Sequence, residues 1–207
     1  MGNTIRKANE NDAAFIAWAI LESSRAGKKI GFFDLIFQSG DDKALLKQLE
    51  KLTVTKTKSY CHYSNFLVAE AGGTPIAVLC GYEPRIATDT IFSKALAELG
   101  VEEGYEERIA AYLLCRPEID RQTWVLDFIE VKPGHDSFEL MKALIQKSLL
   151  TARLKGYRKA QTMVEIGSVE TKMVYDKLGF SFIDEKRSDY YKEVFGRAGI
   201  MRLQMSL

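Results

Sequence analysis

The stretch from Trp124 to Gly156 constrains the fold most strongly, because it places a buried strand directly before a long helix. Trp124–Val131 is an apolar run that ends at Pro133-Gly134, a pair typical of turns. A helical pattern then covers about 137 to 155, and Gly156 is a natural C-terminal cap for it. A central strand followed by a helix predicts a mixed α/β architecture.

The rest of the chain alternates in the same way. Gly72-Gly73, between two apolar runs, predicts a tight hairpin. The aromatic segment 31–37 could line a pocket, although each of its rings is more commonly a core residue. In all, the patterns predict strands at 4–7, 66–70, 75–82, 124–131, 160–165, 180–185 and 200–205, and helices at 13–21, 43–52, 137–155 and 168–178, with two more between 87 and 116.

Composition narrows the class of protein. With 207 residues, 46% of them hydrophobic and 28% charged, the chain can form one globular domain with a sizeable core. The 29 basic and 28 acidic residues give a net charge of +1, so we expect no nucleic-acid or membrane partner. No apolar run reaches the roughly 20 residues of a membrane span. Cys61, Cys80 and Cys115 are scattered and odd in number, which predicts no disulfide framework and no metal site, and favours the cytoplasm.

Three motifs together resemble one known family. Val131-Lys132-Pro133 ends the central strand, Val174-Tyr175-Asp176-Lys177-Leu178-Gly179-Phe180 ends a later helix, and Ile5-Arg6-Lys7-Ala8 opens the chain. They resemble the GNAT superfamily of acyl-CoA N-acetyltransferases over nearly the whole length. The resemblance implies an α/β (α+β) fold with a mostly antiparallel central sheet of six to seven strands, flanked by helices. It also implies one domain over 1–207, with a helical insertion at about 84–118.

The resemblance further implies acetyl-CoA as co-substrate, with its pantetheine arm in a gap between the strands at 124–131 and 160–165. Tyr175 matches the position from which many family members protonate the departing thiolate, a role that suits a phenol. For the base we weigh Glu130 slightly ahead of Asp127. Being an odd number of positions apart, they are expected on opposite faces of the sheet. Core packing of Tyr175, and a structural role for either carboxylate, remain the alternatives.

The pyrophosphate loop departs from the family pattern of Arg or Gln, two residues, Gly, one residue, and Gly or Ala. The equivalent residues are 136–141, where no signature position is kept. Asp136 and Glu139 instead resemble a capping box, and their charges would repel phosphate. Lys132, His135 and Lys142 could compensate. The resemblance places acyl-CoA contacts at Ile129, Val131, Ser137, Phe138, Glu139, Leu140, Met141, Ser168 and Lys177.

Two functions from different classes follow from these features. The first is transfer of an acetyl or other short acyl group to an amine, on a small molecule or a peptide N-terminus. The second is a catalytically inactive GNAT-like binding or regulatory module, which the altered loop favours. Acceptor selectivity is expected at 32–37 and 87–116. The apolar ending 200–205 would permit a homodimer, although the same pattern fits a strand paired within one chain.

Overall fold

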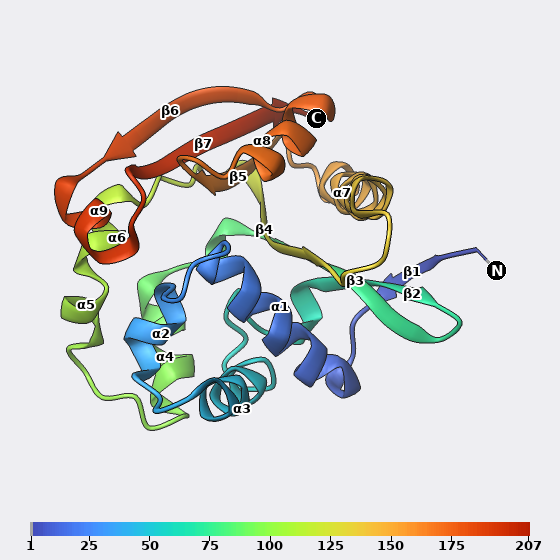
Figure 1. The fold of residues 1–207 in the computed structure, drawn as a ribbon. Coiled ribbons are helices and arrows are strands. Elements are labelled where there is room, and N and C mark those ends of the chain that lie inside the picture. The colour runs from blue at the N-terminus through green and yellow to red at the C-terminus, as the bar shows by residue number, and fades with distance from the viewer. Residues whose placement is uncertain (1) are drawn as a thin grey trace.

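The protein is built around one open sheet of seven strands (Figure 1). The computed structural model describes residues 2–207. The strand order is β1-β2-β3-β4-β5-β7-β6, and every neighbouring pair is antiparallel except β4 and β5. The predicted mostly antiparallel α/β sheet is therefore confirmed. The strands are β1 (Thr4–Lys7), β2 (Phe66–Ala71), β3 (Thr74–Tyr82), β4 (Thr123–Val131), β5 (Lys159–Glu165), β6 (Ser181–Arg187) and β7 (Gly199–Ser206).

Helices cover both faces of this sheet, and each face has its own core. The helices are α1 (Ala13–Arg25), α2 (Phe32–Phe37), α3 (Asp42–Leu52), α4 (Asp89–Ala97), α5 (Tyr105–Arg108), α6 (Ala110–Cys115), α7 (Ser137–Leu154), α8 (Val169–Lys177) and α9 (Asp189–Phe195), with 3-10 turns at Glu10–Asp12, Tyr63–Asn65 and Pro84–Ile86. One core lies between the five helices α1, α2, α3, α4 and α5 and the sheet face that carries Val78 and Cys80. The other joins α7 and α8 with the face that carries Leu79 and Leu126. No helix within residues 2–207 is long and apolar enough to cross a membrane.

Three α-helical segments differ from the sequence pattern. The aromatic segment at 32–37, for which no helix was predicted, forms helix α2. Helix α9 was not predicted, because its seven residues are too few to show a helical period; Ser188 caps it and Gly196, with φ 70°, ends it. The helical stretch after Gly104 is broken at Ile109, which separates α5 from α6. The apolar ending at 200–205 lies in β7, which pairs with β5 on one side and β6 on the other. Its apolar residues therefore serve the core of one chain.

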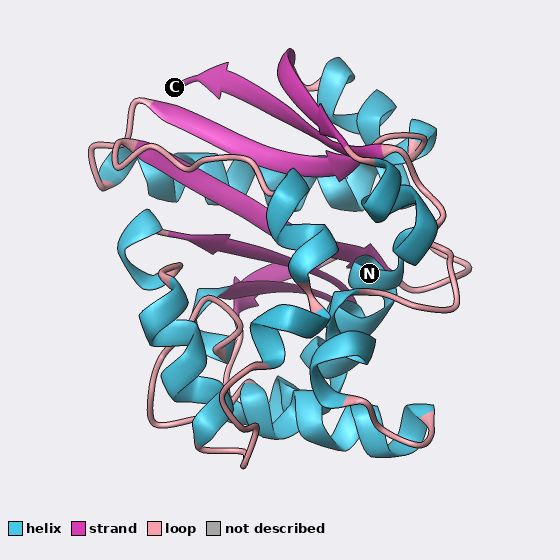
Figure 2. Cartoon of the chain, turned by 90° about the vertical axis from the view of Figure 1, so that its left-hand side faces the viewer, coloured by secondary structure: helices cyan, strands magenta, loops and turns pink. Residues whose placement is uncertain are grey.

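Strands β4 and β5 separate along their length, as the family resemblance implied. They pair in parallel only from Thr123 to Leu126 on β4 and from Lys159 to Thr162 on β5. Beyond that point β4 stays with β3, while β5 follows β7. Figure 2 shows the resulting two arms of the sheet, which diverge from each other.

A bulge in β4 lies at the point where the strands part. Phe128 has φ 45°, a left-handed conformation that is costly for a residue with a side chain. Register with β3 shifts here, so that Cys80 pairs with Asp127 and Val78 pairs with Glu130. Partners directly opposite each other share a face, and alternate residues of one strand share a face. Asp127 and Glu130 therefore point to the same face, and the expectation of opposite faces is wrong because the bulge inserts an extra residue.

Candidate active site

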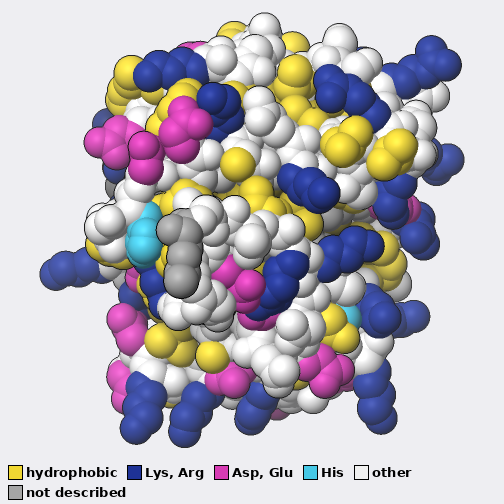
Figure 3. Space-filling model, turned by 90° about the vertical axis from the view of Figure 1, so that its right-hand side faces the viewer, with side chains coloured by type: hydrophobic (Ala, Val, Ile, Leu, Met, Phe, Trp, Pro, Cys, Tyr) yellow, Lys and Arg dark blue, Asp and Glu magenta, His cyan; other side chains and the backbone are white. Residues whose placement is uncertain are grey.

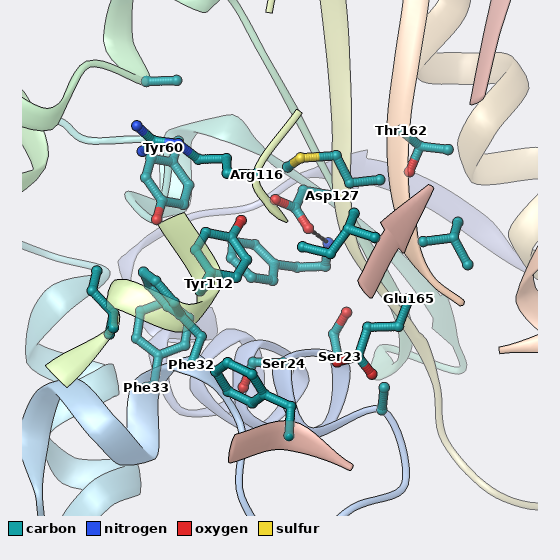
Figure 4. Close-up of a pocket in the computed structure, with 18 of the residues that line it drawn as sticks. Ser23, Ser24, Phe32, Phe33, Tyr60, Tyr112, Arg116, Asp127, Thr162 and Glu165 are labelled. Carbon is teal, nitrogen blue, oxygen red and sulfur yellow. Dashed lines mark hydrogen bonds between the residues drawn. The ribbon is translucent and has the colours of Figure 1, made fainter. Parts of the chain in front are cut away.

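The opening between β4 and β5 continues into a cavity of about 360 Å³. That volume lies in the range of small-molecule sites. β4 contributes 127–130, β5 contributes 162–165, and α8 contributes Thr171 and Tyr175. The far wall comes from α1, α2 and the helical segment between β3 and β4. Figure 4 shows the Asp127 carboxylate near the centre of this space, with Tyr60 and Tyr112 on one side and Thr162 and Glu165 on the other.

Asp127 is a carboxylate inside an aromatic environment. Its Oδ1 accepts a hydrogen bond from the Phe128 backbone N–H at 2.8 Å, and no cation of residues 2–207 pairs with it. Burial raises the pKa of Asp127 to about 6, against the smaller opposing effect of that hydrogen bond. Its charge in turn contributes to the raised pKa of Tyr60, Tyr82 and Tyr112. These three rings therefore surround one negative charge that the protein does not neutralise.

Glu130 is a second carboxylate on the cavity wall that has no cationic partner within residues 2–207. It lies on β4 just after the bulge, is half-buried, and faces α1. Burial raises its pKa to about 7, and the nearby negative charge of Glu22 adds to the effect. A carboxylate that titrates near neutral pH is suited to take a proton from an amine.

Tyr175 approaches the same opening from the other face of the sheet. It is 1% exposed, stacks edge-on against Phe180 with ring centroids 5.0 Å apart, and belongs to the core beneath α7 and α8. Burial raises its pKa, with a further contribution from the charge of Asp127. The phenol therefore stays protonated at neutral pH. The opening thus lies between a hydroxyl donor on one face and two carboxylates on the other.

Aromatic rings from the sheet and from the segments that cover it form one wall of the cavity. Tyr60 lies 5.5 Å from Tyr82, 5.1 Å from Phe92 and 6.1 Å from Phe128 between ring centroids. Phe32 continues the wall to Tyr112 at 4.6 Å. Phe32, Phe92 and Tyr112 come from the two segments in which acceptor selectivity was expected.

A half-buried ion pair ties three elements together beside the cavity. Glu165, at the end of β5, accepts from Lys28 and from the Tyr191 hydroxyl, the latter at 2.7 Å. Lys28 belongs to the loop between α1 and α2, and its pKa is lowered by burial. Unlike Asp127, Glu165 has its charge balanced within the chain, so its contacts account for a structural role.

The start of α7 differs from the capping box that the sequence suggested. Asp136 does accept from the Glu139 N–H, at 3.1 Å, but Glu139 turns away and pairs with Lys142 at 3.3 Å. Lys142 and Lys177 both lie over the Phe138 ring, at 5.9 and 5.0 Å from its centroid. Two lysines therefore stand beside the two carboxylates, and the expected net repulsion of phosphate is reduced. On the face in Figure 3, Lys and Arg side chains are likewise mixed with Asp and Glu.

The residues proposed to contact acyl-CoA occupy three kinds of position. Ile129 and Ser168 line the cavity, and the Ser168 side chain makes no capping hydrogen bond to α8. Leu140 is buried, while Met141 and Val131 pack against the same core, so their side chains are committed to the fold. At the surface, Ser137, Glu139 and Lys177 are exposed and Phe138 is half-buried.

Sequence reasoning missed Tyr60 and Tyr82 as site residues. Tyr60 lies in an irregular stretch with no periodicity, and Tyr82 ends β3 like any strand residue. Only the folded chain brings both within reach of Asp127. Within residues 2–207, no group of three or more His, Cys, Asp and Glu side chains is placed to hold a metal ion.

The fold is shared with solved acetyltransferases. An N-acetyltransferase from Staphylococcus aureus Mu50 superposes with a TM-score of 0.70 at 16% identity, over 98% of this chain and 100% of that one. A GCN5-related N-acetyltransferase from Kribbella flavida superposes with a TM-score of 0.61 at 17% identity, over 99% and 98%. This chain has the GNAT fold. An acetyltransferase from Salmonella typhimurium, solved with its cofactor acetyl-CoA, shares the GNAT fold at a TM-score of 0.55 and 15% identity, over 100% and 95%. No protein-family model and no curated protein matches the sequence.

Proposed function

We propose that this protein is an N-acyltransferase that moves an acetyl or other short acyl group from acyl-CoA to an amine. The observation that carries the proposal is the arrangement at the β4–β5 opening. There the bulge at Phe128 brings Asp127 and Glu130 to one face, and Tyr175 lies on the other. An amine acceptor needs a base and a thiolate needs a proton donor, so the opening holds both kinds of group.

The chain's residues supply the following chemistry. Acyl-CoA supplies a thioester carbonyl when it is bound. Glu130, titrating near neutral pH, takes the proton that the amine must lose before its nitrogen can attack that carbonyl. Beyond Leu126, β4 has no partner strand on the side of β5 within residues 2–207, so backbone N–H groups of 129–131 that point to that side can donate to the carbonyl oxygen. Tyr175, neutral at this pH, donates a hydrogen bond to the departing sulfur.

The residues at the start of α7 fit a pyrophosphate better than their sequence suggests. The N–H groups at a helix start attract anions, and those of Ser137 and Phe138 have no hydrogen-bond acceptor within residues 2–207. Lys142 and Lys177 stand over Phe138 and supply positive charge. In this proposal the ammonium groups of two lysines help to bind the pyrophosphate, which in the family pattern is bound by a glycine-rich loop.

The inactive binding module remains the second candidate, because Asp136 occupies one N–H donor at the start of α7. In either case we propose one domain over 1–207, in which the segment 84–118 is an insertion that supplies part of the acceptor wall.

A cytoplasmic location is proposed because the three cysteines are all free thiols. A homodimer formed by strand pairing would use β6, whose outer edge is unpaired and which exposes Phe182 and Ile183.

Calorimetric titration with acetyl-CoA and with free CoA, at low and moderate salt, tests whether the protein binds the co-substrate. Release of CoA, followed with a thiol reagent over a panel of amines, tests the transfer. We expect binding that weakens with salt and amine-dependent CoA release that Glu130→Gln lowers. Binding without amine-dependent release would support the inactive module, and absence of binding to both compounds would refute acyl-CoA chemistry at this opening.

A further inference from the structure

The cavity carries an excess of negative charge that the protein does not balance. The charged groups on its wall are Asp89, Glu106, Asp127, Glu130, Glu165 and Arg116. Arg116 is the only cation in that set, and both its terminal nitrogens are bound to Asp89, at 2.7 and 3.2 Å. Glu165 is bound to Lys28. The uncompensated charges are therefore Asp127 and Glu130 inside, and the exposed Glu106 at the rim.

Arg116 does not act as the hidden partner of Asp127. Burial and the Phe128 N–H account for the pKa of Asp127, with no contribution from a cation. For Glu130 the one charge that contributes is Glu22, which is also negative. A half-buried carboxylate is stabilised by a positive partner, and neither Asp127 nor Glu130 has one within residues 2–207. A cationic ligand can therefore supply the positive partner that residues 2–207 do not provide.

The rings around Asp127 favour the same kind of ligand. Tyr60, Tyr82 and Tyr112 enclose its charge, and Phe92 and Phe32 extend the wall. Aromatic faces attract ammonium groups, and more strongly when water is excluded. The same faces provide apolar contact for the hydrocarbon part of a ligand. Aromatic rings around a single carboxylate are suited to an alkylammonium group.

The two carboxylates are spaced for two nitrogens. Their β3 partners, Cys80 and Val78, are two residues apart, so Asp127 and Glu130 are separated by about 7 Å along the strand. Building on the proposed transferase function, we propose that the acceptor is a short aliphatic dication. Asp127 holds one ammonium group among the aromatic rings, and Glu130 receives the proton from the other nitrogen, which is then acylated. An amine with a carboxylate beside either nitrogen would meet like charge at this wall and is disfavoured.

Three compounds that differ in one group test this assignment. 1,5-Diaminopentane has two amines at a suitable spacing, 1-aminopentane lacks one of them, and lysine adds a carboxylate. We expect kcat/KM for the diamine to exceed that for each of the other two by about tenfold or more, as for a hydrogen bond to a charged group. In Asp127→Asn the preference over 1-aminopentane should disappear. Glu103→Gln, which removes an exposed charge elsewhere in the segment between α4 and α5, is the control and should keep the preference.

Calorimetric binding of the diamine, without acyl-CoA, separates this inference from the proposed transferase function. Binding to the parent protein that Asp127→Asn abolishes would support the dication site even if no acyl transfer occurred. Equal kcat/KM for the three compounds, or a preference unchanged in Asp127→Asn, would overturn the inference while leaving the transferase intact. Failure of the diamine both to bind and to react would overturn it as well.

Discussion

Replacing Asp127 by asparagine should stabilise the fold at neutral pH, although it removes a group from the site. Asparagine is nearly isosteric, and its carbonyl oxygen can still accept from the Phe128 N–H. The substitution therefore removes the charge and keeps the contact. What changes is the free energy of holding an ionised carboxylate in an apolar cavity.

The sign and size of the effect follow from the pKa of Asp127, which is raised from 3.8 to about 6. Between these values the folded chain binds a proton that the unfolded chain has lost, so the free energy of unfolding falls as the pH rises. Below 3.8 both states are protonated and the term is absent. Above 6 both states are ionised and the destabilisation is complete; it corresponds to roughly 3 kcal/mol, since one pKa unit is worth about 1.4 kcal/mol. Access of water through the cavity reduces this, so we expect about 2 kcal/mol.

Urea unfolding of the parent protein and Asp127→Asn at pH 4 and pH 7.5 measures the effect. We expect nearly equal unfolding free energies at pH 4 and the variant more stable by about 2 kcal/mol at pH 7.5. Asp120→Asn is the control, because Asp120 is exposed in a loop and its Oδ1 likewise accepts a backbone N–H, so the substitution removes a solvated charge and keeps the contact. A variant that is no more stable than the parent at pH 7.5 would show that Asp127 is solvated or paired, and would remove the basis for the dication site.

Four further predictions concern separate parts of the molecule. The rate kcat/KM should rise with pH through an apparent pKa of about 7 if Glu130 is the base, and Glu130→Gln should remove that limb of the profile. Tyr175→Phe should lower kcat at least tenfold while the calorimetric Kd for CoA changes little, because the hydroxyl serves the departing sulfur; an equal loss in both would contradict this role. Lys177→Ala should weaken CoA binding severalfold, and less so at high salt, whereas Lys147→Ala, at an exposed position further along α7, should not. Ser148→Ala should destabilise the fold by about 1–3 kcal/mol in thermal or urea unfolding, because the buried Trp124 N–H, now bonded to Ser148 Oγ at 2.9 Å, would lose its acceptor.

The sheet and its major helices could be predicted because local signals agree with the final packing. The run 124–131 became β4, Pro133-Gly134 ended it, and α7 stops just before Gly156. Helix α9 could not be predicted, since seven residues with a mixed polar pattern carry too little periodic signal. Its place is fixed instead by contact with α6 and by the Tyr191 bond to Glu165.

The site could be predicted only in part. Tyr175, Asp127 and Glu130 were singled out from the sequence, and the structure brings all three to one cavity. Their relative orientation was wrong because simple alternation assumes an unbroken strand, and nothing in the sequence around Phe128 announces a bulge. At the start of α7, Asp136 and Glu139 were identified from the sequence. The position of Lys177 over Phe138 could not be predicted, because Lys177 belongs to α8 and its contact with α7 does not follow from spacing along the chain.

The bulge connects the cost in stability to the proposed chemistry. In a regular strand one of the two carboxylates would face the core under α7, and a single negative charge would remain at the opening. With the extra residue both face the aromatic wall, and burial raises the pKa of each without any cation to oppose it. A bound dication would supply both missing charges at once, so its binding free energy includes relief of the unfavourable burial. The unpaired charge of Asp127 lowers the free energy of unfolding of the free chain. Pairing that charge with an ammonium group contributes to the affinity that we propose for the acceptor.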